Sequence, residues 1–185
     1  ENKKDAIFSA TIRMINEVGY ANVSMSKIAK VAGVSASTLY TYYENKEDMF
    51  RKVYVEAKKL MLSAGSKGIN ESETVKQSAK RFCSNVIKFL QEEKEYFLFI
   101  DQSSSSPLIS EAMYEDINVQ NQKIFLAFER GVKEGVLKNA PVDLLIGFCF
   151  YPITQIYKES CHPQALTKDI DYELVFNMCW DAIKK

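Results

Sequence analysis

The chain has 185 residues, of which 46% are hydrophobic and 26% charged. This composition excludes a disordered chain and is typical of one domain, or of a small domain plus a larger one. No apolar run approaches the roughly 18–20 residues that cross a bilayer, and the first residues lack the apolar core of a signal peptide. We therefore expect a cytoplasmic protein with no membrane partner. The net charge is zero, so any DNA binding must rest on a few well-placed groups.

Helical periodicity dominates the first third of the sequence and predicts an all-α fold. Ser24, Ser35 and Asn45 can each cap a short helix, and three capping residues within about twenty positions are typical of a helix-turn-helix. A glycine suits the end of a helix, and Gly19 and Gly33 stand at such positions. The helices predicted here are residues 3–18, a second from Ser24 to Gly33, a third over residues 36–43, and a fourth from Asn45 to about Leu62. A loop should follow from Ser63.

The remaining sequence also reads as helices joined by loops. The proline at the start of two of these helices suits the first helical position, and a proline inside a helix causes a kink. The predicted elements are a helix from Ser72, a short aromatic helix from Glu95, a long helix from Pro107 that ends at Gly131 or Gly135, a helix from Pro141 with a kink at Pro152, and a last helix from about Asp171. Leu174, Val175, Met178 and Trp180 should lie on or near one face of the last helix.

The third helix has an unusual outer face. On a helical wheel with Leu39 pointing inward, Tyr43 also points inward, and Val34 precedes the helix as an apolar anchor. The outward and edge positions carry small residues, hydroxyls and tyrosines with no charge: Ala36, Ser37, Thr38, Tyr40, Thr41 and Tyr42. A merely solvated face would carry Lys and Glu. Tyrosine and threonine hydroxyls can donate to phosphates, and a threonine methyl can contact a thymine methyl, so this face predicts DNA contact.

The run IAKVAGVSASTLYTYYENKEDMF, from Ile28 to Phe50, resembles the DNA-binding signature of the tetracycline-repressor-like (TetR) transcriptional regulators. The upstream NEVGY and VSMSKIA segments fit the same signature, which covers roughly residues 5–55. The resemblance implies a helix-turn-helix DNA-binding domain over residues 1–46. It also implies a larger helical domain over residues 47–185 that binds a small-molecule effector and dimerises.

The same resemblance implies a homodimer that presents the third helix of each subunit to the major groove of a palindromic, double-stranded DNA operator. It implies that the protein is a repressor which its effector releases. The DNA contacts carried over are Met25, Ser26, Ser35, Ala36, Ser37, Thr38, Tyr40, Thr41, Tyr42 and Lys46. Ala36 departs from the Lys or Gln that many relatives have at this position. Discrimination is then expected to shift toward methyl contacts, DNA shape or an N-terminal arm.

The apolar segments GFCFYPITQIY and LVFNMCW can pack across a two-fold axis as a four-helix bundle, or can complete a monomeric core. We expect a largely apolar or aromatic effector. Asn121 is the most interesting candidate for its pocket, because an amide within an apolar stripe must find a partner. The candidates are Phe89, Phe97, Gln102, Asn121, Phe125 and Tyr151.

Other functional classes find little support in the sequence. The four cysteines are widely spaced and read as buried or half-buried thiols. The single histidine, His162, follows Cys161 but has no ligand-spaced partners, so we expect no metal and no cofactor. No nucleophile with a plausible partner and no phosphate-binding glycine loop is present, which argues against an enzyme. The alternative is a helical ligand-binding or adaptor module without specific DNA binding.

Overall fold

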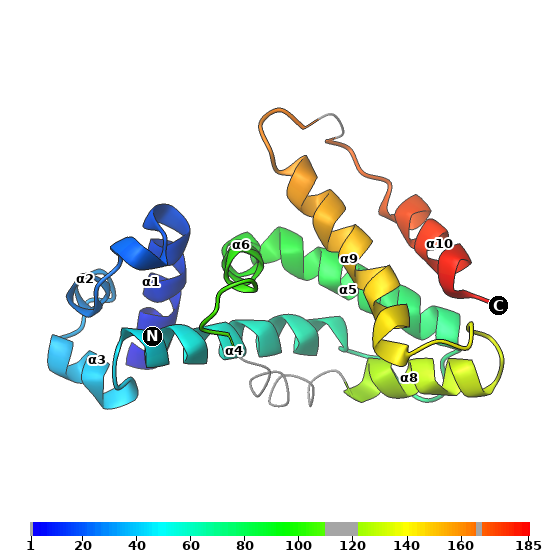
Figure 1. Cartoon of the computed structure of the whole chain (residues 1–185), viewed down its shortest axis with the longest axis horizontal. Coiled ribbons are helices and arrows are strands. Elements are labelled where there is room, and N and C mark those ends of the chain that lie inside the picture. Colours follow the sequence, from blue (N-terminus) through cyan, green and yellow to red (C-terminus); the bar gives the residue numbers. More distant parts are fainter. Residues whose placement is uncertain (1, 110–121, 166–167) are drawn as a thin grey trace. The chain divides into compact units, whose positions relative to one another are not determined.

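A computed structural model describes residues 2–109, 122–165 and 168–185, and these residues confirm the all-α prediction (Figure 1). Within them the only β pairing is an isolated bridge between Leu137 and Lys184. Two compact units share the chain: unit 1 holds residues 1–60 and 93–117, and unit 2 holds residues 61–92 and 118–185. The helices are α1 Lys3–Val18, η1 Tyr20–Asn22, α2 Met25–Val31, α3 Ala36–Tyr42, α4 Lys46–Gly65, α5 Val75–Glu92, α6 Lys94–Ser103, α8 Gln122–Lys133, α9 Val142–Ser160 and α10 Tyr172–Ile183.

In unit 1, α1 supplies the centre of the core and packs on both α2 and α6. Ile7, Ile12 and Ile15 recur at helical spacing and are all buried. Gly19 ends the helix as predicted: its φ of 77° lies in the region that favours glycine, and its amide donates to the Ile15 carbonyl. The helix therefore forms a fixed support behind the turn that follows.

The predicted caps of the short helices are confirmed. The Ser24 side chain accepts a hydrogen bond from the Lys27 amide at the start of α2. The Ser35 side chain does the same for the Thr38 amide at the start of α3. Between the two helices, Gly33 takes a φ of 68°, which allows a tight turn with little steric cost. The turn brings α3 against α2 while its opposite face stays exposed.

Helix α4 begins where Asn45 was expected to cap it, since the Asn45 Oδ1 atom accepts a hydrogen bond from the Asp48 amide at 2.9 Å. Its predicted end near Leu62 was wrong, because Ser63, Ala64 and Gly65 are still helical. The Asn85 side chain of α5 donates to the carbonyls of Gly65 and Lys67 at 3.0 and 2.8 Å. A side chain from a different helix thus satisfies the carbonyls at this end of α4.

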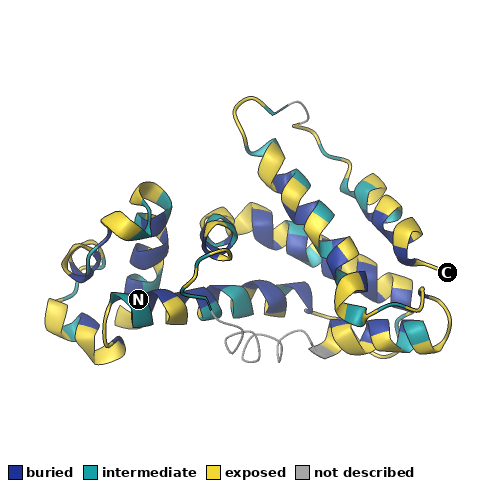
Figure 2. Ribbon diagram, in the orientation of Figure 1, coloured by how far each residue is buried: buried dark blue, intermediate teal, exposed yellow. Residues whose placement is uncertain are grey.

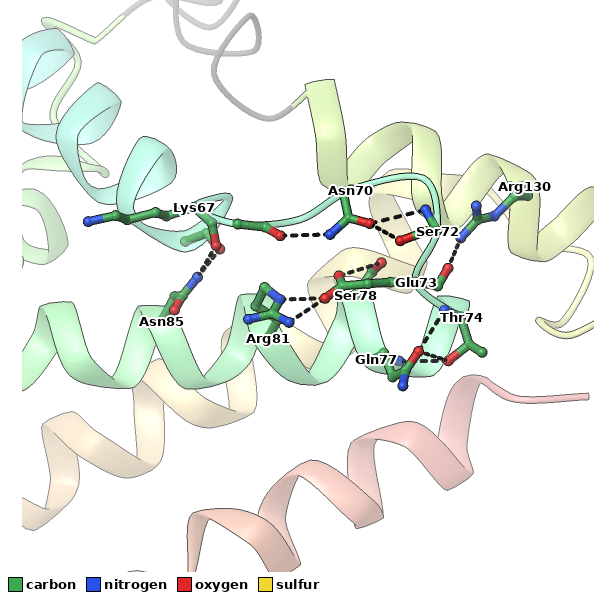
Figure 3. Close-up of polar contacts among 12 residues, drawn as sticks. Lys67, Asn70, Ser72, Glu73, Thr74, Gln77, Ser78, Arg81, Asn85 and Arg130 are labelled. Carbon is green, nitrogen blue, oxygen red and sulfur yellow. Dashed lines mark hydrogen bonds and ion pairs between the residues drawn. The ribbon is translucent and has the colours of Figure 1, made fainter.

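The predicted start of α5 at Ser72 was also wrong. The Thr74 hydroxyl accepts a hydrogen bond from the Gln77 amide, and the Gln77 side chain accepts one from the Thr74 amide (Figure 3). This reciprocal capping box fixes the first helical residue as Val75. The prediction that a helix begins at Pro107 was wrong as well, because Pro107 lies in a turn after α6.

The sequence predicted that α8 ends at Gly131 or Gly135, and the structure shows that Gly135 is the one that ends it. Gly135 has a φ of 72° and its amide donates to Val132, so Gly135 follows the helix as its stop. Gly131 lies inside α8, where an added Cβ atom would stand 2.7 Å from Val75 Cγ1 and 2.8 Å from Leu137 Cδ1. Because Gly131 has no side chain, α8 can approach the side chains of Val75 and Leu137 closely.

Helices α9 and α10 pack on each other in unit 2 (Figure 1). α9 begins after Pro141 and contains Pro152, as expected. The expectation of one shared face on α10 was wrong. Trp180 is buried with Phe176 and Cys179, whereas Leu174 and Met178 are more than half exposed on the other side. The pair of helices thus has a buried face and an exposed apolar face (Figure 2).

Candidate nucleic-acid interface

The helical wheel drawn for α3 describes the structure well. Leu39 is fully buried and Tyr43 is 4% exposed, as predicted, and Val34 is half-buried at the turn. Ala36, Ser37 and Thr41 are exposed, Tyr40 is 54% exposed and Tyr42 36% exposed. The structure therefore brings the predicted α3 residues together on one accessible surface without an ionised side chain.

A network of hydroxyl groups covers the start of this surface. The Ser35 Oγ atom lies 2.8 Å from the Ser37 hydroxyl and 2.9 Å from the Thr38 hydroxyl, besides capping the helix. The Thr41 hydroxyl donates to the Thr38 carbonyl at 2.6 Å. These contacts orient the small hydroxyls. Within the described residues the Tyr40 hydroxyl makes no hydrogen bond, so it is available to a ligand.

The two DNA contacts predicted on α2 differ in their exposure. Ser26 is exposed, and its hydroxyl lies 3.1 Å from that of Ser24. Met25 is only 8% exposed, and its side chain belongs to the core rather than to the interface. Two lysines of α2, Lys27 and Lys30, are also exposed and add positive charge to this helix.

Lys46 occupies a defined position at the start of α4. Its Nζ atom lies 4.2 Å from the centre of the Tyr20 ring and 3.4 Å from the Ala21 carbonyl oxygen. Burial and the Glu47 carboxylate raise the pKa of Tyr20, and Arg51 opposes them. The tyrosine thus holds the Lys46 ammonium by a cation–π contact while the residue remains partly exposed.

The sequence prediction missed two residues that lie at the candidate interface. Tyr20 is the first, although an aromatic residue directly after a helix-ending glycine is a signal that could have indicated it. Lys3 is the second. It lines a hollow of about 470 Å³ between the start of α1 and the α2–α3 turn, together with Gly33, Ser35 and Thr38. Only the packing of α1 against this turn brings Lys3 to the candidate interface.

The candidates for the effector pocket fall in both units. Phe97 is buried in unit 1, where Gln102 is exposed and donates to the Asn16 side chain. Phe89 is buried in unit 2, where Phe125 and Tyr151 are 39% and 69% exposed. Asn121 lies outside the described residues. The structure therefore does not gather these candidates into one cavity within either unit.

The remaining chemistry of the described chain is structural. Cys83, Cys149 and Cys179 are buried and Cys161 is half-buried, all as free thiols, as expected. Contact with Cys149 and burial raise the pKa of Cys83 well above its ordinary value, which keeps the thiol protonated. In residues 2–109, 122–165 and 168–185 no three His, Cys, Asp or Glu side chains are arranged to hold a metal ion. None of the helices described is long and apolar enough for a bilayer.

Comparison with known proteins gives results for both parts of the chain. The model of the bacterial regulatory proteins of the tetR family matches residues 7–53, and that of the tetracyclin repressor-like C-terminal domain matches residues 75–184. An uncharacterized HTH-type transcriptional regulator of Haemophilus influenzae is 26% identical over 183 residues, which cover 98% of this chain and 95% of the relative.

Solved structures agree with this result. The crystal structure of a TetR family transcription regulator from Marinobacter aquaeolei has a TM-score of 0.89 and 26% identity, covering 99% of this chain and 96% of its own. The regulator FadR from Bacillus subtilis, solved in complex with stearoyl-CoA, shares the fold with a TM-score of 0.73 and 21% identity, covering 96% of each chain.

Proposed function

Because this chain belongs to the TetR family of transcriptional regulators, with a helix-turn-helix DNA-binding domain and no enzymatic role, we propose that it is a repressor. It acts in the cytoplasm, where it binds a palindromic operator as a dimer. The observation that carries this proposal is the exposed face of α3, which offers hydroxyls, methyls and two tyrosines without any charge. Such a face suits the edges of bases in a major groove.

The proposed division of labour follows the sequence. Residues 1–46 bind DNA, and residues 47–185 bind the effector and dimerise. The exposed apolar residues of α9 and α10 support dimerisation. Their spacing places them on one face of each helix, and monomeric proteins seldom expose such a stripe. The stripe consists of Leu144, Phe148, Tyr151, Leu174 and Met178.

The effector is proposed to be largely apolar or aromatic. The stearoyl-CoA bound by FadR of Bacillus subtilis shows that a protein of this fold accommodates a long apolar chain. An effector can bind more tightly to the conformation whose recognition helices are badly spaced for the operator than to the DNA-binding conformation. The difference between the two binding free energies is the amount by which it lowers operator affinity. Phe89, Phe97, Gln102, Asn121, Phe125 and Tyr151 remain its proposed contacts.

The first experiment is fluorescence anisotropy with duplex DNA from upstream of this protein's own gene, against a scrambled duplex in the same buffer. We expect an excess affinity of at least ~10³-fold for the upstream duplex. Replacing both Thr41 and Tyr40 with Ala should reduce this excess, whereas replacing the exposed Lys133 of α8 with Ala should not. No binding to any duplex would overturn the proposal and favour the adaptor module.

A further inference from the structure

A second hollow, of about 590 Å³, lies within unit 2 between the loop after α4 and the outer side of α8. Its volume falls in the range of small-molecule sites. Ile69 from the loop and Leu126 and Ala127 from α8 form its apolar surface, and Glu71, Lys123 and Arg130 contribute charged groups. None of these residues belongs to the proposed effector contacts or to the stripe on α9 and α10.

Side chains from two helices hold the loop in place (Figure 3). The wall that the loop contributes to the groove is therefore already formed. From α5, Asn85 binds the carbonyls of Gly65 and Lys67, and Arg81 forms an ion pair with Glu73. From α8, the Arg130 guanidinium donates to the Glu71 carbonyl at 2.6 Å and also to the Glu73 carbonyl. A preformed wall reduces the conformational entropy that a ligand must offset on binding.

The groove carries more positive than negative charge. Arg130 uses two N–H groups on main-chain carbonyls, which do not neutralise its charge, and Glu73 is already paired with Arg81. Lys123 is exposed and forms no ion pair with the described residues. Glu71 supplies one opposing carboxylate. Among the described residues, one cationic charge of the groove therefore stays uncompensated beside apolar surface.

The apolar part of the groove is partly exposed in the part of the chain that the structure describes. Leu126 is 52% exposed, although it lies next to Ala127 and Ile69, which are buried. A ligand lying along α8 would remove the Leu126 side chain from water while its charged end reached Lys123, about one helical turn away. A ligand that meets both conditions has an apolar body and an anionic end.

We propose that this groove binds a small amphipathic carboxylate, with its carboxylate at Lys123 and its apolar body on Ile69, Leu126 and Ala127. The site goes beyond the proposed effector pocket. It needs neither DNA nor a partner subunit, so its test is independent of operator binding.

The test is isothermal titration of the full chain with octanoate, 1-octanol and octylamine. We expect octanoate to bind with one site per chain, at least about tenfold more tightly than the other two compounds. Lys123→Gln and Leu126→Ser should each weaken octanoate binding by about tenfold. Lys133→Gln on the same helix and Val136→Ser, an exposed apolar residue just after it, are the matched controls, and neither should change it. Phe125→Ser, at a proposed effector contact, distinguishes the two sites. Circular dichroism checks that each variant keeps its helices.

Three results would overturn the proposal. The first is equal affinity for octanoate and 1-octanol, which would remove the role of the charge. The second is an octanoate affinity that Lys123→Gln and Leu126→Ser leave unchanged. The third is weaker binding in Phe125→Ser but not in Leu126→Ser, which would place octanoate among the effector contacts instead of in the groove.

Discussion

Among the hydroxyls on α3, that of Tyr40 is the one whose role is easiest to isolate. It has no hydrogen bond within the described chain, and the side chain is 54% exposed. Tyr40→Phe removes only this hydroxyl, so we expect the free energy of operator binding to weaken by about 1 kcal/mol. Anisotropy titration measures the change, and Tyr172→Phe on α10 is the control. Unchanged affinity would remove Tyr40 from the DNA contacts.

Lys58 on α4 offers a prediction about pH. Burial lowers the pKa of its ammonium to about 8, although the nearby Asp101 carboxylate opposes this effect. Between pH 8 and the ordinary value of 10.5, the unfolded chain therefore binds more protons than the folded one, and stability rises with pH. Below pH 8 both states are protonated, and the full cost of burying the charge remains.

Replacing Lys58 with Met should remove that cost. We expect Lys58→Met to raise the free energy of unfolding at pH 7 by about 1–2 kcal/mol relative to the parent chain. The gain should shrink as the pH rises from 8 to 10, because the parent loses its buried charge there. Urea denaturation of both proteins at each pH measures the difference. An equal gain at pH 7 and pH 10 would contradict the assignment.

Single positions show what a helical wheel can and cannot predict. Leu39 and Tyr43 were placed correctly because helical periodicity alone decides which side of α3 they face. The burial of Met25 could not be predicted in this way, since it depends on how α2 packs against α1. The contact between Lys46 and Tyr20 joins the start of α4 to η1, and no pattern within either segment contains that information.

At the level of elements, α3 depends on the Ser35 cap. Ser35→Ala removes the acceptor of the Thr38 amide, and we expect it to destabilise the fold by about 1 kcal/mol. Operator binding should weaken as well, because the same hydroxyl orients those of Ser37 and Thr38. Urea denaturation together with anisotropy measures both effects. Ser37→Ala serves as the comparison, since it removes an exposed hydroxyl without removing the cap, and should leave stability within about 0.5 kcal/mol. Equal stability of the two variants would contradict the role of Ser35 as a cap.

The end of α4, which the sequence misplaced, has a tertiary cause. SAGSKGINESE reads locally as a loop, yet its first residues complete α4. Gly65 approaches Phe82 so closely that an added Cβ atom would stand 2.8 Å from the ring, and Asn85 binds its carbonyl. Both partners belong to α5. Tertiary contacts therefore decided this boundary against the local propensity.

For the whole molecule, the exposed stripe on α9 and α10 leads to a test of the dimer. Phe148 is 49% exposed within this stripe. Phe148→Glu places a charge where the proposed partner packs, so we expect sedimentation equilibrium to show monomers and operator affinity to fall at least tenfold. Leu126→Glu on α8 is the control, because Leu126 is exposed to a similar extent but lies outside the stripe. A parent chain that is itself monomeric would contradict the proposed dimer.

The fold class and the exposed, uncharged face of α3 were predictable from the sequence because both follow from periodicity and caps within short segments. The two units of the structure were not, since residues 93–117 join residues 1–60 across an intervening α5. The predicted boundary at residue 46, between a DNA-binding domain and an effector-binding and dimerisation domain, remains a proposal. The groove beside α8 likewise depends on contacts among α5, α8 and the loop between α4 and α5.

The lack of charge on α3 separates two quantities that usually change together, the affinity for DNA and the preference for the operator over other sequences. Salt weakens DNA binding because the counterions released from neutralised phosphates gain less entropy as the salt concentration rises, and only cationic groups neutralise phosphates. Here such groups, including Lys46, lie outside α3, whereas the groups proposed to read the bases carry no Lys, Arg, Asp or Glu. Added salt should therefore weaken binding to the operator and to a scrambled duplex by the same factor. The ratio of the two dissociation constants would then stay constant while each rises, and the protein would select its site equally well across a wide range of ionic strength.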